Sequence, residues 1–149
     1  MPIEFNMRIA TDQSPEAVLD RVINYLGIHE SRDHAREHSI NCLDAITESS
    51  FAQELIQASF EFKPTVMLNI QLDKFGDLQR GKDLVVDAIK FLLLELPGEI
   101  LVLEDNESAL LLRRNGVVFV QSKSDFWSPS RLSRLSFTIE AVELPKWME

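Results

Sequence analysis

The sequence predicts an α+β fold: a mainly antiparallel sheet of about five or six strands with two or three helices packed on one face. Two observations predict it. Apolar and polar residues alternate with a period of two in several short segments, which is typical of half-buried strands, and other segments repeat apolar residues at helical spacing. Because no repeat, low-complexity linker or change in composition divides the chain, residues 1–149 are expected to form one domain.

The first predicted elements are a strand and a helix. Apolar residues alternate with mostly polar ones over residues 3–9, which predicts the strand. Ser14 is a suitable N-cap, Pro15 suits the first helical position and Gly27 ends the apolar stripe of the helix. The polar segment 28–38 that follows is expected to be a loop.

A weaker strand candidate covers residues 39–46, with Ile40, Cys42 and Ile46 on one side. In such an apolar pattern we expect Cys42 to be a buried and unreactive thiol. A helix is then predicted over residues 49–60, where Phe51, Leu55 and Ile56 fall at suitable intervals.

Residues 66–72 alternate strictly and predict a strand with one wet face. The longest predicted helix covers residues 77–96 and ends at Pro97-Gly98. Its apolar surface exceeds one stripe, so we expect it to be covered on more than one side.

The C-terminal part is expected to form an antiparallel meander. Asn115-Gly116 is a strong hairpin signal because both residues tolerate positive φ. Residues 104–107 form a polar turn, and a short helical piece is expected around Arg131–Leu135. The strands predicted here are 100–103, 110–112, 117–120 and 137–144.

The net charge indicates which classes of partner the protein can bind. With 15 Lys and Arg against 24 Asp and Glu, the formal net charge is −9. An acidic protein repels phosphate backbones and anionic lipid, so nucleic acid and membranes are not expected as partners. A basic protein is the natural electrostatic partner, although an acidic surface also serves solubility alone. No secretory signal or membrane span is visible, so the cytoplasm is the expected compartment.

The densest acidic group comprises Glu95, Glu99, Glu104, Asp105 and Glu107. It is either an ordinary wet turn or a patch that binds a partner. Trp127 beside Phe126 either fills the end of the core or serves as an interface anchor. These five residues (Glu99, Glu104, Asp105, Glu107 and Trp127) are the partner-binding candidates.

The sequence offers little for catalysis. There is no Gly-x-Ser-x-Gly elbow, phosphate-binding loop or dinucleotide fingerprint, so no catalytic residue or cofactor is predicted. One alternative stays open. His34, His38 and Cys42 are spaced four apart, and on a continuous helix they would share a face able to hold zinc in an enzyme or sensor.

The second half of the chain resembles a known family. Its most specific motifs are Leu72-Asp73-Lys74-Phe75 and the run from Phe126-Trp127 to Arg131-Leu132. The other matching residues are Pro64-Thr65-Val66, Gly81, Leu93, Pro97-Gly98-Glu99, Leu111-Leu112-Arg113-Arg114-Asn115-Gly116 and Leu144-Pro145. In this span, about Pro64 to Pro145, the chain resembles the third-type immunity proteins of the swappable inherited toxin (Sit) systems of myxobacteria. Residues 29–38 depart from that pattern.

The resemblance implies a cytoplasmic, non-enzymatic protein that binds and blocks a cognate bacterial toxin domain. In those systems a toxin passes between kin cells and the immunity protein protects the recipient. Besides the metal-site hypothesis, a third stays open: a structural adaptor or self-associating subunit that uses the broad apolar face of the 77–96 helix.

Overall fold

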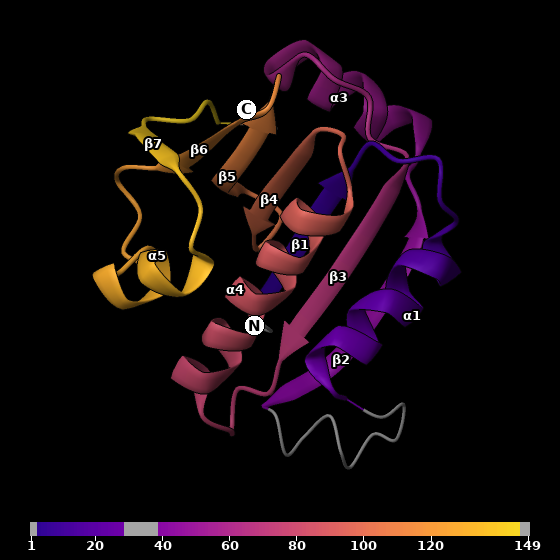
Figure 1. Ribbon diagram of the computed structural model, residues 1–149. Helices are drawn as coiled ribbons and strands as arrows, with labels where there is room; N and C mark the ends of the chain where they lie inside the picture. Colours follow the sequence, from indigo (N-terminus) through magenta and orange to yellow (C-terminus); the bar gives the residue numbers. More distant parts are fainter. Residues whose placement is uncertain (1–2, 29–38, 147–149) are drawn as a thin grey trace.

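A computed structural model describes residues 3–28 and 39–146, which form one seven-stranded sheet and four helices (Figure 1). The α+β class is confirmed, with a sheet slightly larger than expected. The strands are β1 (Ile3–Ile9), β2 (Ile40–Thr47), β3 (Val66–Leu72), β4 (Ile100–Glu104), β5 (Ser108–Arg114), β6 (Val117–Gln121) and β7 (Ile139–Val142). The helices are α1 (Pro15–Leu26), α3 (Ser50–Phe60), α4 (Leu78–Glu95) and α5 (Pro129–Leu135). The predicted loop 28–38 lies, apart from Ile28, outside the described residues.

The strands follow the order β2-β3-β1-β4-β5-β6-β7. Neighbours pair antiparallel except for β6 and β7, which are parallel. The expected meander therefore ends at β6. The connection to β7 contains α5, and such a crossover returns the chain to the starting end of β6, from which a parallel strand begins.

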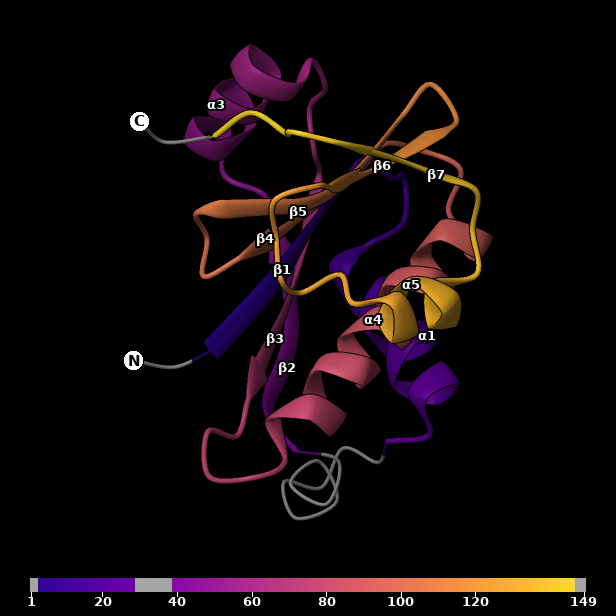
Figure 2. The same ribbon diagram turned by 90° about the vertical axis from the view of Figure 1, so that its left-hand side faces the viewer.

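The helices lie on both faces of the sheet (Figure 2). Three of them, α1, α4 and α5, share one face and contribute to the larger core, as expected. The fourth, α3, lies on the opposite face. It buries Ala52, Ile56 and Phe60 against a second apolar cluster that includes Leu101 and Leu103 of β4. Because these three residues recur every fourth position, they form the packed stripe, and Phe51 is instead 68% exposed.

Helix α4 is enclosed on several sides, as its wide apolar surface predicted. The Asp77 side chain caps its start by accepting a hydrogen bond from the backbone N of Arg80 (3.1 Å). The helix packs on β3 and also contacts α1 and α5. Its broad apolar face is thus covered within the chain, which leaves the adaptor hypothesis without the surface on which it depended.

Two tight places in the backbone require particular residues. Asn115 and Gly116 both have positive φ (51° and 78°) and connect β5 to β6, so the predicted hairpin is confirmed. At Gly98 a Cβ atom would lie 2.2 Å from the carbonyl oxygen of Ala10. Only glycine lets the chain between α4 and β4 pass so close to the loop after β1.

The prediction for β2 was partly wrong. A register shift between Ile40 and Cys42 places Ile40 in the core and moves Cys42 to the other side of the strand. Leu43 then packs against the larger core, whereas Cys42 is exposed and Ile46 is 50% exposed. The expected buried thiol is therefore wrong, because one irregular step exchanges the faces of every residue that follows it.

Candidate functional site

The acidic turn, Glu104 to Glu107, connects β4 to β5. Asp105 and Asn106 both adopt positive φ (53° and 60°), which Asp and Asn tolerate better than other side chains. Glu107 N donates to the carbonyl oxygen of Glu104 over 3.1 Å and closes the turn. Asp105, Asn106 and Glu107 are exposed, whereas Glu104 is half-buried.

Asp105 also has a structural role. Its backbone N donates to the carbonyl oxygen of Glu4 (2.8 Å), and its carboxylate accepts a hydrogen bond from the backbone N of Glu4 (3.1 Å). The turn is therefore attached to the start of β1. Burial raises the pKa of Glu104, the negative charge of Asp105 raises it further, and Lys82 of α4 opposes the shift.

A buried polar network holds the turn from below. The Arg8 guanidinium donates to Asn106 Oδ1 over 2.6 Å and to Asn6 Oδ1 over 3.0 Å. It also forms an ion pair with Glu48, 2.5 Å long, in which the two side chains are 6% and 2% exposed. Sequence reasoning missed both ion-pair residues. The available signal was the row Glu4, Asn6 and Arg8 on one side of an apolar strand.

Glu99 does not lie beside the acidic turn. It precedes β4, whereas Glu104 ends that strand, so the extended strand separates them. Glu99 is instead near Arg113, whose guanidinium donates to the carbonyl oxygens of Leu93, Leu96 and Gly98 at the C-terminal end of α4. Burial lowers the pKa of Arg113 and Glu99 raises it. Glu99 therefore lies near Arg113, beyond the C-terminal end of α4.

Trp127 lies in the core. It is 8% exposed, its indole Nε1 donates to the carbonyl oxygen of Leu110 over 2.7 Å, and its ring meets that of Phe126 edge-on at 4.9 Å. The interpretation that these aromatics fill the end of the core is confirmed. The ring of Phe126 in turn lies 5.3 Å from the ring of Phe5 in β1.

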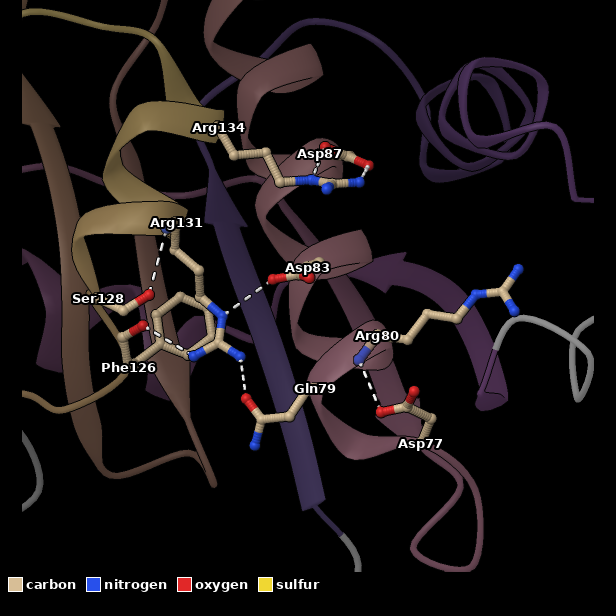
Figure 3. Close-up of polar contacts among 9 residues, drawn as sticks. All are labelled: Asp77, Gln79, Arg80, Asp83, Asp87, Phe126, Ser128, Arg131 and Arg134. Carbon is tan, nitrogen blue, oxygen red and sulfur yellow. Dashed lines mark hydrogen bonds and ion pairs between the residues drawn. The ribbon is translucent and has the colours of Figure 1, made fainter.

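Arg131 of α5 connects the same aromatic group to α4 (Figure 3). It is 8% exposed and lies over the Phe126 ring at 5.3 Å. Its guanidinium donates to Asp83 Oδ1 (3.2 Å), Gln79 Oε1 (2.6 Å) and the carbonyl oxygen of Phe126 (3.2 Å). The motif from Phe126 to Arg131 therefore attaches α5 to α4 and to the core.

A groove of about 780 Å³ adjoins the acidic turn. Its other wall is the segment after β7, which a reciprocal pair of hydrogen bonds between Gln121 and Leu144 holds in place (3.2 and 3.4 Å). Lys123 and Glu143 form an ion pair across 3.2 Å on this side. Ala109 and Leu110 of β5 also line the groove. The acidic turn therefore borders a recess rather than a flat surface.

The metal hypothesis receives no support from the described part of the chain. His34 and His38 lie outside the described residues, and Cys42 is exposed on a strand. Within residues 3–28 and 39–146, no three His, Cys, Asp or Glu side chains are grouped as metal ligands. In the same residues, no helix combines the length and apolar character needed to cross a membrane.

Comparisons with known proteins agree with the resemblance seen in the sequence. No curated protein and no solved structure matches the chain significantly. The SitI3-like family matches residues 3–131, from the first described residue of β1 to Arg131. This match spans far more than half of the 149 residues. The chain therefore belongs to the SitI3-like family.

Proposed function

We propose that this chain is an immunity protein that binds a cognate bacterial toxin domain and blocks it without catalysing a reaction. The observation that carries the proposal is family membership over residues 3–131. As the resemblance implies, the protein would act in the cytoplasm of the cell that it protects. Inhibition would come from occlusion, because a bound protein of this size covers the active surface of a toxin.

The acidic turn is the contact region that we propose within this function. Asp105 and Glu107 are exposed, and the described residues give neither carboxylate an ion pair with Lys or Arg. Unpaired charge at a protruding turn accelerates association with an oppositely charged protein. Trp127 is not included because it is buried, and Glu99 is not included because it lies at the other end of β4.

The test takes as its candidate toxin the protein encoded by the reading frame next to this gene, once its toxic activity has been measured, and titrates it with the full chain. We expect toxin activity to fall linearly and reach its minimum at one chain per toxin, with a matching stoichiometry by calorimetry. Inhibition by far less than one equivalent would indicate turnover and contradict the non-enzymatic mechanism. A toxin that stays active with excess chain and forms no complex would contradict the proposed function.

A further inference from the structure

Within residues 3–28 and 39–146, one part of the sheet has no helix over it. The open sheet face is the side of β2, β3 and β1 that points away from α1, α4 and α5. Strand pairing aligns its side chains in three rows that cross β2, β3 and β1 in that order: Cys42, Gln71 and Glu4; Asp44, Asn69 and Asn6; Ile46, Met67 and Arg8. The apolar cluster under α3 contains residues of β4, β5, β6 and β7 but none of β2 or β3. Helix α3 therefore leaves β2 and β3 uncovered (Figure 2).

The exposure of these side chains falls from β2 to β1: those of β3 are half-buried, and Asn6 and Arg8 of β1 are buried. On β2, Cys42 and Asp44 are exposed and Ile46 is 50% exposed. At one end of the face, the loop after β3 projects on the same side of the sheet as α3 (Figure 2). It carries Phe75, which is 87% exposed and whose ring lies beneath Lys74 Nζ at 5.2 Å. Apolar groups surrounded by polar ones are the usual composition of a protein interface.

Each face of the sheet carries acidic side chains that form no ion pair among the described residues. On the helical face, Asp83, Asp87 and Glu95 are each paired with an arginine, whereas Glu16 and Asp20 of α1 are exposed and form none. On the open sheet face, Glu4 and Asp44 form no ion pair with Lys or Arg among the described residues.

The acidic turn adds Asp105 and Glu107 beside this face, because Asp105 is hydrogen-bonded to Glu4. The cation within the rows, Arg8, is buried and forms an ion pair with Glu48.

We infer that the open sheet face and the adjoining acidic turn together form the docking surface for a basic protein surface, with Asp44, Ile46 and Phe75 among its contacts. The inference rests on the proposed function and makes the basic surface that of the toxin. A second copy of this chain is disfavoured as the occupant, because its own Glu4 and Asp44 would face the same acids. The apolar groups supply contact area, and the acids select a partner with Lys and Arg.

Cys42 offers a direct test, because it is the only cysteine and lies within this face. We expect excess toxin domain to slow alkylation of Cys42 by a maleimide by at least about tenfold, since a docked protein excludes the reagent. The control is a Cys42→Ser chain with Ser133→Cys, which moves the thiol to an exposed position on α5. Its alkylation rate is expected to be the same with and without toxin.

Two matched pairs of variants test the contacts. Asp44→Lys is expected to weaken toxin binding by about tenfold or more, mainly through slower association. Asp20→Lys makes the same charge change at an exposed position of α1 and is expected to leave affinity within about twofold. Phe75→Ala is expected to weaken binding by a similar factor. Leu94→Ala, at an exposed apolar residue of α4, is expected to leave it unchanged.

The outcomes separate the two proposals. If the wild-type chain binds and blocks the toxin while Cys42 stays fully reactive and Asp44→Lys behaves like Asp20→Lys, the docking surface is wrong and the immunity function stands. If Cys42 becomes protected as the chain alone is concentrated, a second copy occupies the face and the inference is overturned. If wild-type chain and toxin form no complex, both proposals fail.

Discussion

The guanidinium of Arg8 and the carboxylate of Glu48 form an ion pair, 2.5 Å long, between β1 and the residue that follows β2. Both side chains are almost completely buried, and Glu48 Oε2 lacks a hydrogen-bond partner in the described structure. The same guanidinium holds Asn106 of the acidic turn. The pair therefore connects three parts of the chain that are distant in sequence: positions 8, 48 and 106.

Breaking this ion pair from one side should be strongly destabilising. We expect Arg8→Met to lower the free energy of unfolding by roughly 3–5 kcal/mol, because Glu48 is left as a buried and unpaired charge. The double variant Arg8→Met with Glu48→Leu should lose less than Arg8→Met alone, since no isolated charge remains. Urea unfolding measures both. A double variant that is less stable than both single variants would contradict this account.

Two variants of Asp105 should distinguish the structural role of its side chain in the acidic turn from the effect of its charge. Asp105→Asn keeps an acceptor for Glu4 N and tolerates positive φ, so we expect the free energy of unfolding to change by less than about 0.5 kcal/mol. Asp105→Val loses the acceptor and introduces a β-branched residue at φ 53°, which should cost about 2–4 kcal/mol. Thermal or urea unfolding checks both values. Equal losses in the two variants would show that the charge, not the geometry, stabilises the turn.

The thiol of Cys42 should titrate above its ordinary range. Partial burial of the sulfur raises its pKa, and the carboxylates of Asp44 and Glu4 raise it further. Because the thiolate is the reactive form, we expect the alkylation rate to rise at higher pH than for an unperturbed cysteine. Asp44→Asn removes a negative charge that disfavours the thiolate, so the profile should move to lower pH. Asp20→Asn on α1 should leave it in place, and a shift in that control would contradict the local origin.

Arg131 should contribute far more to stability than Arg134, although both are arginines of α5 paired with aspartates of α4. Arg131→Met removes three hydrogen bonds around a buried guanidinium, which we expect to cost about 2–4 kcal/mol. Arg134 is 44% exposed, so Arg134→Met should cost less than about 1 kcal/mol. Urea unfolding measures the difference, and equal losses would contradict it.

Trp127→Phe tests the assignment of that residue to the core. The variant removes the indole donor to Leu110 and leaves a buried carbonyl oxygen without its partner, which should cost about 1–3 kcal/mol. Toxin affinity of the folded variant should equal that of the wild-type chain, because the side chain lies below the surface. A large loss of affinity with unchanged stability would restore Trp127 as an interface anchor.

Much of this fold was predictable because it depends on neighbours in the chain. The alternation in β1 and β3, the capped helices α1 and α4, and the Asn115-Gly116 hairpin each follow from local backbone preferences and from the period of apolar residues. The family resemblance also came from sequence motifs, and the match over residues 3–131 confirms it. The sequence by itself thus determined the class of fold, most of its elements and the family.

The tertiary structure alone decided which residues meet. The irregular step after Ile40 moved Cys42 and Ile46 to the open sheet face, and strand pairing placed Cys42 and Glu4 in one row across β3, with Asp44 in the next row. The length of β4 also separates Glu99 from the acidic turn. Local patterns could not show this, because contacts between strands depend on strand order and register. Those are set by burial over the whole chain rather than by any one segment.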